Sequence, residues 1–544
     1  MQNWPLLISK LIDHAAQNHG TREIVSRTPE GPLVRSNWRT VATRSRQLAQ
    51  WLVGKGISPG DRIGTLASNT HRHLETWFGI AGAGAIVNTV NPRLFDEQIT
   101  YIINHAHDRV LFFDSTFLPI VEKIAEHLSV DHYIVLTDAQ NMPESSLPLL
   151  CYEDILSSVD GDFTWVAVGE DDPVGLCYTS GTTGAPKGVL YSHRSNVLQS
   201  WSVCMPDGFA IAARSVVMPV VPMFHANAWS LPYACAMAGA KLVLAGPAND
   251  AASLQALMID EGVTVTAAVP TIWLGMLRHL DATGGGLGQL NRVVIGGSAA
   301  PASMIERFER DFAVTVIHAW GMTETSPLGS FGTLCPEVEK MPYPAQLDYK
   351  AKQGRAPFGV ELKVTLNGDG APVPRDGRTS GHLLIRGPWI IDRYFGANTD
   401  TIDAEGWFDT GDIAMIDPFG YMQITDRAKD VIKSGGEWIS SIDLENVAVG
   451  CPGVAEAAVI GVPHSKWDER PLLIVVRQPG AAVTKPDILA YLSGRIAKWW
   501  MPNEVVFVDA MPHSATGKIL KVALREQFNG FRFPDDLSTI TPST

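Results

Sequence analysis

Short apolar runs alternate with helical patterns in the middle of the chain, between about residues 170 and 320. Apolar residues recur at spacings of three and four in three segments, which predicts helices over 251–261, 271–280 and 301–312. The apolar runs predict strands at 216–221, 240–244, 263–269, 292–295 and 314–317. Such alternation is typical of parallel sheets covered by helices, so we expect an α/β fold.

The pattern changes after about residue 355. Turn sequences at 367–370 and 417–420 punctuate the chain there, which predicts a β-rich subdomain. From about residue 430 a smaller α+β unit is predicted, and charged residues at 426–430 separate it from the preceding part. Its predicted elements are helices over 443–449 and 486–498 and strands at 457–461 and 472–477.

Composition favours a globular enzyme of several domains. Of the 544 residues, 45% are hydrophobic and 18% are charged, a balance that excludes a disordered or fibrous chain. The formal net charge is −14, which argues against broad electrostatic binding of nucleic acid. An anionic ligand must therefore be held by local donors.

The N-terminal pattern and the cysteines favour a cytoplasmic protein. The first residues carry no basic region of a signal peptide, and Leu7, Leu11 and Ala15 fit an amphipathic helix. The apolar stretches are shorter than the ~20 residues that span a bilayer, so we expect no transmembrane segment. The six cysteines include no CxxC pair, which argues against a zinc cluster.

The strongest local signal is the run 178–188, which follows a strand-like segment at 174–177 and precedes a helical pattern at 196–203. Hydroxyl and glycine residues there let side chains and backbone N–H groups converge on a phosphate, and a lysine adds positive charge. The run is not a Walker A loop, because Pro186 stands where that motif requires glycine. An ordinary surface loop is the alternative. The candidate phosphate-binding residues are Thr179, Ser180, Gly181, Thr182, Thr183, Gly184 and Lys187.

This run resembles the phosphate loop of the AMP-forming acyl-CoA synthetases, relatives of firefly luciferase and of nonribosomal adenylation domains. Four further motifs of that family follow in the same order, at 319–325, 408–412, 426–438 and 512–519. The resemblance implies a large N-terminal domain, 1–428, of parallel-rich sheets covered by helices with a β-rich subdomain. It also implies a small, mobile α+β C-terminal domain, 429–544, that turns about a hinge at Lys429.

The resemblance also implies a nucleotide and metal site. Glu324 with Thr179 would hold Mg²⁺, for which oxygen ligands are suited. Asp412 would accept the ribose hydroxyls, with Arg427 and Lys429 as donors near the nucleotide. Taken singly, Glu324 fits a solvated acid and Asp412 a turn residue. The other predicted nucleotide and CoA contacts are Gly297, Ser298, Ala299, His318, Ala319, Trp320, Gly321, Met322, Thr323, Lys433, Gly435, Gly436 and Trp438.

Lys518 is the predicted catalytic lysine of the first step. A carboxylate that attacks an α-phosphate brings two anions together, and a cation between them stabilises the charge of the transition state. Alone, such a lysine fits an ordinary solvated cation. Its place in the sequence Thr516-Gly517-Lys518-Ile519, which resembles the last family motif, favours the catalytic interpretation.

His225 and Trp229 are predicted to meet the acyl group. They are four residues apart and would share one face if their segment were helical. Packing in the core is the alternative for both. The resemblance implies that His225 is catalytic, between the acyl and nucleotide sites, and that Trp229 gates the acyl tunnel, with Gly321 as a further substrate contact. Amino-acid-activating relatives usually carry aspartate at the position of His225, which argues against an amino acid substrate.

Segments 433–440 and 464–471 resemble the medium-chain branch, and more closely the ligases for 3-methylmercaptopropionate in dimethylsulfoniopropionate metabolism. The expected reaction joins a carboxylic acid to ATP, giving acyl-AMP and pyrophosphate, and then transfers the acyl group to CoA. The expected acid is a short-to-medium-chain fatty or methylthio-alkanoic acid, and a homodimer is expected. Alternatives are a long-chain fatty acid–CoA ligase, a luciferase-like monooxygenase and a non-catalytic nucleotide-binding protein.

Overall fold

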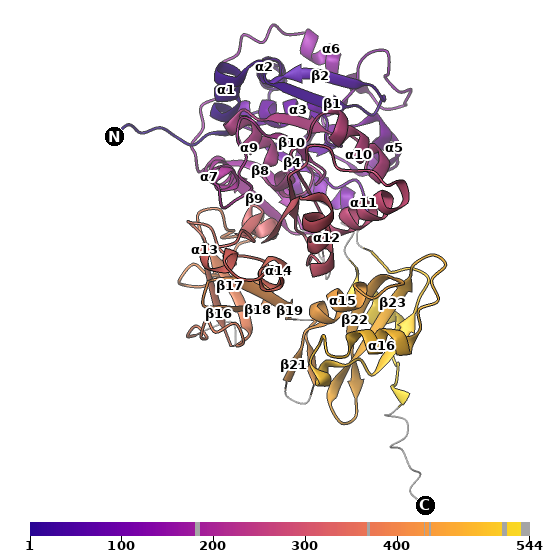
Figure 1. Ribbon diagram of the computed structural model, residues 1–544. Coiled ribbons are helices and arrows are strands. Elements are labelled where there is room, and N and C mark those ends of the chain that lie inside the picture. The colour runs from indigo at the N-terminus through magenta and orange to yellow at the C-terminus, as the bar shows by residue number, and fades with distance from the viewer. Residues whose placement is uncertain (180–184, 367–369, 429, 435–436, 514–518, 535–544) are drawn as a thin grey trace, which may run out of the picture.

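The computed structural model describes residues 1–179, 185–366, 370–428, 430–434, 437–513 and 519–534. It is an α/β protein with two large, mainly parallel sheets, a four-stranded sheet and a smaller C-terminal domain. Figure 1 shows the two large sheets at one end of the molecule and the C-terminal domain at the other. Within the described residues, no helix has the length and apolar character needed to cross a bilayer.

The first large sheet has eight strands and includes all five strands predicted between 216 and 317. Six parallel strands form its centre, and β2 and β15 pair with the outer two in the antiparallel sense at the two edges. In spatial order the strands are β15 (Leu328–Phe331), β14 (Thr315–Gly321), β13 (Arg292–Ile295), β12 (Val265–Ala268), β10 (Val216–Pro219), β11 (Lys241–Leu244), β1 (Glu23–Arg27) and β2 (Leu33–Asn37).

Amphipathic helices cover this sheet. In α12 (Ala302–Phe312) the apolar spacing places Met304, Ile305 and Phe308 on one buried face, which belongs to the same apolar cluster as residues of β13 and β14. The predicted helices over 251–261, 271–280 and 301–312 are therefore confirmed within about three residues. The other helices of this region are α1 (Ile8–His19), α7 (His193–Cys204), α9 (Leu231–Ala238), α10 (Ala251–Asp260), α11 (Pro270–Thr283), α13 (Pro336–Glu339) and α14 (Tyr343–Ala351).

The second large sheet has seven strands, parallel except for the hairpin of β8 and β9. In spatial order these are β7 (Leu149–Cys151), β6 (His132–Val135), β5 (Asp108–Phe113), β3 (Arg62–Leu66), β4 (Ile86–Thr89), β8 (Pro173–Tyr178) and β9 (Gly188–Ser192). One apolar core joins this sheet to the first. Its helices are α2 (Trp38–Gly54), α3 (His71–Gly82), α4 (Asp96–Ala106), α5 (Leu118–Ile124) and α6 (Tyr152–Ser157).

Two smaller sheets complete the fold. The predicted β-rich subdomain is an antiparallel sheet of β16 (Glu361–Thr365), β17 (Gly381–Arg386), β18 (Phe408–Ile416) and β19 (Met422–Arg427). The C-terminal sheet contains β20 (Ile432–Ser434), β21 (Glu437–Ile439), β22 (Val454–His464), β23 (Asp468–Arg477) and β24 (Glu504–Phe507). Its helices are α15 (Ser441–Val449), α16 (Lys485–Leu492) and α17 (Lys521–Gln527).

Several predicted boundaries are wrong; β22 and β23, for example, begin at residues 454 and 468, before the predicted strands at 457–461 and 472–477. The strand predicted at 314–317 continues to Gly321, because its last residues pair with β15. The helix predicted over 486–498 ends at Leu492, because Gly494 takes a left-handed conformation with φ of 78° and breaks the helical hydrogen bonding. The turn predicted at 417–420 is confirmed by the Gly420 N–H to Asp417 C=O bond of 2.9 Å, whereas 367–369 lie outside the described residues.

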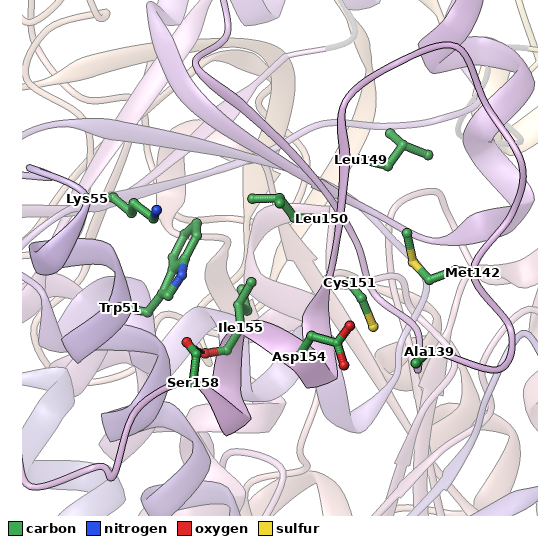
Figure 2. A pocket seen from close by; sticks show the side chains of 10 residues that line it. All are labelled: Trp51, Lys55, Ala139, Met142, Leu149, Leu150, Cys151, Asp154, Ile155 and Ser158. Atoms are coloured by element: carbon green, nitrogen blue, oxygen red, sulfur yellow. Dashed lines mark hydrogen bonds between the residues drawn. The ribbon is translucent and has the colours of Figure 1, made fainter.

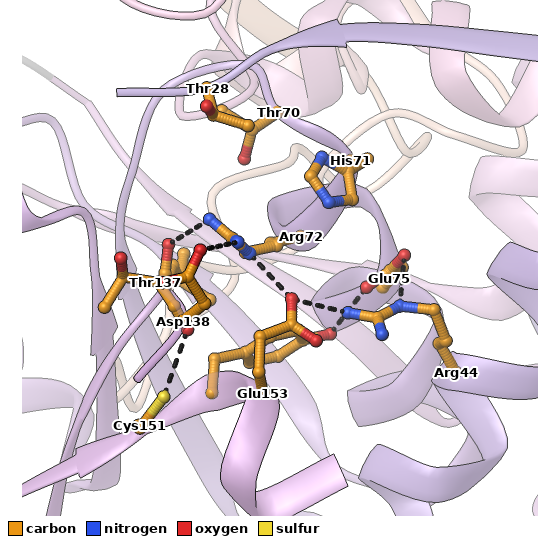
Figure 3. Close-up of polar contacts among 12 residues, drawn as sticks. Thr28, Arg44, Thr70, His71, Arg72, Glu75, Thr137, Asp138, Cys151 and Glu153 are labelled. Atoms are coloured by element: carbon orange, nitrogen blue, oxygen red, sulfur yellow. Dashed lines mark hydrogen bonds and ion pairs between the residues drawn. The ribbon is translucent and has the colours of Figure 1, made fainter. Parts of the chain in front are cut away.

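A buried ionic network joins α2, α3 and α6 (Figure 3). Arg44 contacts Glu75 at 2.8 Å and Glu153 at 3.0 Å, and Arg72 contacts Glu153 at 2.9 Å. The Tyr152 hydroxyl donates a hydrogen bond of 3.0 Å to Glu75, whose side chain is fully buried. Burial raises the pKa of Glu75, and Arg44 opposes that rise. Buried charges are stable only when they are paired in this way.

Candidate active site

The predicted site residues follow the carboxyl ends of β8, β13 and β14. Thr179 comes directly after β8, Gly297 follows β13, and Glu324 lies in the 3₁₀ turn after β14. Tyr191 of β9 donates a hydrogen bond of 2.8 Å to the Thr323 carbonyl, which links the two sheets at this edge. In open α/β sheets, ligands bind at the carboxyl ends of the strands.

The two ends of the phosphate loop lie side by side on the β8–β9 hairpin. The Thr179 N–H donates to the Lys187 carbonyl at 2.9 Å, and the Lys187 N–H donates to the Thr179 hydroxyl at 3.3 Å. The Lys187 ammonium lies 4.9 Å from the centre of the Tyr394 ring. The predicted residues Ser180, Gly181, Thr182, Thr183 and Gly184 lie outside the described residues.

Glu324 is buried and held at two points by the segment after β17. The Tyr394 hydroxyl donates a hydrogen bond of 2.8 Å to Glu324 Oε1, and the Ile391 N–H donates to the Glu324 carbonyl at 2.9 Å. Burial and the neighbouring carboxylate raise the pKa of Tyr394, so its phenol is a donor at neutral pH. No local pattern in the sequence marks Tyr394, which lies 70 residues from its partner.

Asp412, Trp320 and Arg427 form a second group. The Trp320 indole N–H donates to Asp412 Oδ2 at 3.1 Å, and Arg427 Nε contacts Oδ1 at 2.9 Å. Asp412 and Arg427 are also paired across β18 and β19. The indole of Trp320, itself a predicted nucleotide contact, thus also orients the predicted ribose acceptor.

Trp229 is almost fully buried, with 8% of its surface exposed, and its indole lies against Gly296. A Cβ at Gly296 would lie 3.1 Å from Trp229 Cη2 and 2.9 Å from the Ala319 carbonyl, so no side chain fits there. A Cβ at Gly321 would lie 1.6 Å from the Pro327 carbonyl. At both glycines a neighbouring backbone carbonyl therefore lies too close to allow a side chain.

His225 and Trp229 do not share one face of a right-handed helix, because their segment is not such a helix. Residues 226–230 all have positive φ, between 32° and 59°, and form a left-handed turn labelled α8 (Ala226–Trp229). Each such residue costs roughly 1–2 kcal/mol, so tertiary contacts must hold the turn. One is the hydrogen bond of 2.8 Å from the Asn227 amide to Asn196 on α7.

Asn69, which no motif predicted, holds the segment that leads to His225 in place. Its amide donates to the Pro219 and Val221 carbonyls at 3.0 Å, and its Oδ1 accepts from the Met223 N–H at 2.7 Å. It also lines a cavity of about 260 Å³ together with Phe224 and the exposed Arg93. No local pattern marks this asparagine, which lies 154 residues from Met223.

The remaining predicted residues of the N-terminal part occupy the same strand ends. Gly297, Ser298 and Ala299 follow β13, Ala319 lies on β14, and Met322 precedes the 3₁₀ turn. His318 is buried with Nδ1 3.0 Å from the Ala351 carbonyl on α14, and burial lowers its pKa to about 4. Its ring therefore packs toward α14.

Two predicted residues of the C-terminal domain lie in the part of the chain that the structure describes. Lys433 on β20 and Trp438 on β21 are paired across an antiparallel ladder. Lys429, Gly435, Gly436 and Lys518 lie outside the described residues. Beyond residue 429, α15 meets the end of β19, where the Ser441 N–H donates to Asp426 at 2.8 Å.

A larger cavity of about 440 Å³ lies elsewhere, between α2, α6 and β7 (Figure 2). None of the predicted site residues that the structure describes lines it. Its walls are mostly apolar, with Lys55 and Asp154 among them. It is therefore separate from the candidate site.

The Glu324 carboxylate is suited to bind a magnesium ion that the phosphates of a nucleotide also coordinate. Across the part of the chain that the structure describes, no three His, Cys, Asp or Glu side chains gather into a metal cage. Mg²⁺ in phosphate-transfer sites needs only one or two carboxylates, because the phosphates and water supply the other ligands. One buried carboxylate beside the phosphate loop meets that requirement.

Comparisons with known proteins identify the family and the fold. The family model described as AMP-binding enzyme matches residues 12–395, and that of the AMP-binding enzyme C-terminal domain matches 443–518. The chain is 51% identical to 3-methylmercaptopropionyl-CoA ligase of Ruegeria lacuscaerulensis, over 97% of this chain and 98% of the relative. It is 48% identical to medium-chain-fatty-acid–CoA ligase of Ectopseudomonas oleovorans, over 96% of each. The crystal structure of the anthranilate CoA ligase AuaEII with anthranoyl-AMP shares the fold, with a TM-score of 0.85, 24% identity, and coverage of 97% and 98%.

Proposed function

The chain belongs to the AMP-binding enzyme family and is an AMP-forming acyl-CoA ligase, and on that premise we propose a short-to-medium-chain or methylthio-alkanoic acid, such as 3-methylmercaptopropionate, as its substrate. The observation that carries the proposal is the 51% identity to a 3-methylmercaptopropionyl-CoA ligase over almost the whole chain. The indole of Trp229 against Gly296 supports it, because a bulky wall at this point favours a small acid.

In the first step, the acid attacks the α-phosphate of ATP and pyrophosphate leaves. Glu324 and the Thr179 hydroxyl would hold Mg²⁺, which neutralises phosphate oxygens when bound. Lys187 would bind the phosphates, and Asp412, oriented by Trp320 and Arg427, would accept the ribose hydroxyls. Lys518 would stabilise the charge that develops between the two anions.

In the second step, the CoA thiol attacks the acyl carbonyl and AMP leaves. A thiol with a pKa of about 8.5 is only partly ionised at neutral pH, so orientation must supply much of the rate. We propose His225 beside the reacting carbonyl, and the cavity lined by Phe224 and Arg93 as the path for CoA. The cation of Arg93 suits the phosphates of CoA, and the cavity leads toward the segment that carries His225.

We further propose that residues 429–544 turn about Lys429 between the two steps, bringing Lys433 and the glycines 435–436 toward CoA. Lys429→Pro should then leave acyl-AMP formation measurable and slow thioester formation by roughly tenfold or more, since proline fixes φ near −65° and restricts the hinge. Single-turnover assays of each half-reaction measure this. Lys429→Ala is the control that separates lost charge from lost rotation, and normal acyl-CoA production by the proline variant would place the hinge elsewhere.

A panel of acids tests the proposed substrate. Pyrophosphate release and acyl-CoA formation are measured for straight-chain acids from acetate to palmitate and for 3-methylmercaptopropionate. We expect the highest kcat/KM for the short and medium acids, with the methylthio acid among them. A maximum at palmitate would support the alternative of a long-chain ligase, and oxygen consumption with light emission would support a luciferase-like monooxygenase.

Trp229→Ala should change the ranking of acids more than the affinity for ATP. Removal of the indole opens volume beside Gly296, so longer acids should gain relative to short ones. A tryptophan that serves only the core would instead cost about 3–5 kcal/mol of stability on truncation, with the ranking unchanged. The acid panel and thermal melting, run on the same preparations, distinguish the two.

The homodimer and the cytoplasmic location stay predictions. Light scattering of the purified protein would measure the native mass. Fractionation of the source cells would measure the location.

A further inference from the structure

A seven-residue segment after β17, residues 389–395, ties the phosphate loop to the turn that carries Glu324. On one side, the Ser326 hydroxyl donates to the Trp389 carbonyl at 2.7 Å and the Ile391 N–H donates to the Glu324 carbonyl at 2.9 Å. On the other side, the Phe395 N–H donates to the Gly188 carbonyl at 2.8 Å. The backbone of this segment is therefore anchored to both loops.

Tyr394 is the side chain of this segment that meets both functional groups. Its hydroxyl donates to Glu324 Oε1 at 2.8 Å, and its ring centre lies 4.9 Å from the Lys187 ammonium. Its backbone also bridges to Val189 at the start of β9. The side chain is partly buried, so the position of its ring is set by the surrounding contacts.

The hydrogen bond is directed to one oxygen of the carboxylate. Among the contacts of the described residues, the Tyr394 hydroxyl is the donor to Oε1, and none of those residues donates to Oε2. A carboxylate held through one oxygen keeps the other in a defined direction, as in metal sites where an outer partner orients the ligand. The ring, at the same time, offers its negative face to the lysine cation.

We propose that Tyr394 is a positioning residue for acyl-AMP formation: its hydroxyl orients the Glu324 carboxylate, and its ring orients the Lys187 ammonium. One side chain thereby sets the spacing between the metal ligand and the phosphate-binding cation. This inference rests on the proposed function, in which Glu324 holds Mg²⁺ and Lys187 contacts the phosphates.

Tyr394→Phe tests the hydroxyl, because it removes that group and keeps the ring. Titration calorimetry with Mn²⁺, on enzyme saturated with a non-hydrolysable ATP analogue, should show a metal affinity about 10- to 100-fold lower than that of the parent. The half-saturating Mg²⁺ concentration for pyrophosphate release should rise in parallel. Thioester formation from supplied acyl-AMP should be unchanged, since that step needs no triphosphate.

Tyr191→Phe is the matched control. The Tyr191 phenol is buried and donates to the Thr323 carbonyl at 2.8 Å, one residue before Glu324, and within the described residues it makes no hydrogen bond to the Glu324 carboxylate. The Tyr191→Phe variant should leave the Mn²⁺ affinity unchanged. If both variants merely melt at lower temperature and bind Mn²⁺ like the parent, the hydrogen bond of Tyr394 is only structural and the inference is wrong.

Tyr394→Leu tests the ring. It should weaken binding of the ATP analogue in the absence of metal, whereas Tyr394→Phe should not, because only the leucine variant removes the contact with Lys187. Equal metal-free affinity in the two variants would refute the part of the proposal that concerns the lysine.

Glu324→Gln separates failure of this inference from failure of the proposed function. If that variant binds Mn²⁺ as well as the parent does, Glu324 is no metal ligand and the proposed function is wrong at this point. If it weakens binding and Tyr394→Phe does not, only the role of Tyr394 is wrong. If both weaken binding, the double variant should bind no worse than Glu324→Gln alone, since coupled residues are non-additive.

Discussion

Lys518→Ala should lower the rate of acyl-AMP formation by about 10²- to 10³-fold and spare thioester formation from supplied acyl-AMP. The physical reason is that the lysine faces a build-up of negative charge only in the first step, where a carboxylate approaches a phosphate. Loss of one positioned donor to such a transition state commonly costs that factor. Pyrophosphate release measures the first step, and acyl-CoA formation from synthetic acyl-AMP measures the second.

Two further variants show whether the loss of acyl-AMP formation depends on this position and on its positive charge. Lys498→Ala removes an exposed lysine of the same domain and should leave both half-reactions unchanged. Lys518→Arg keeps a cation and should recover part of the first step. If Lys518→Ala slowed both half-reactions equally, the prediction that Lys518 acts only in the first step would be wrong.

Arg44→Met should destabilise the N-terminal domain by about 3–5 kcal/mol without changing the balance of the two half-reactions. The substitution leaves the fully buried Glu75 without its nearest cation, and an uncompensated buried charge carries that cost. Urea denaturation followed by tryptophan fluorescence measures the change. Because burial already raises the pKa of Glu75, the carboxyl of the variant takes up a proton as the pH falls. The loss of stability should therefore be smaller in mildly acidic than in mildly alkaline buffer.

Arg109→Met is the matched control for the effect of burial. Arg109 also contacts two carboxylates, Asp61 at 3.0 Å and Asp131 at 2.9 Å, but its side chain is 36% exposed. Exposed ion pairs contribute about 0–1 kcal/mol, so this variant should be close to the parent in stability. Equal losses for the two arginines would show that the network in Figure 3 stabilises the fold no more than surface pairs do.

The sequence by itself determined the elements whose signal is local. The strand at 292–295 and the amphipathic helix that begins near residue 301 could be predicted because apolar residues recur with the period of the element that buries them. The family motifs could be found for a similar reason, since a loop that surrounds a phosphate needs glycines and hydroxyls close together in the chain. The α/β class and the smaller C-terminal domain followed from the order of these elements.

Only the tertiary structure decided how the site is held together. Tyr394 meets Glu324 across 70 residues, Trp320 meets Asp412 across 92, and Asn69 meets Met223 across 154. Hydrogen bonds between such distant segments leave no periodic pattern in the sequence. The left-handed turn at 226–230 was missed because its intrinsic conformational preference is unfavourable, and packing around Asn227 and Trp229 must offset that cost. Local spacing therefore identified the residues of the candidate site, whereas long-range packing determined their geometry.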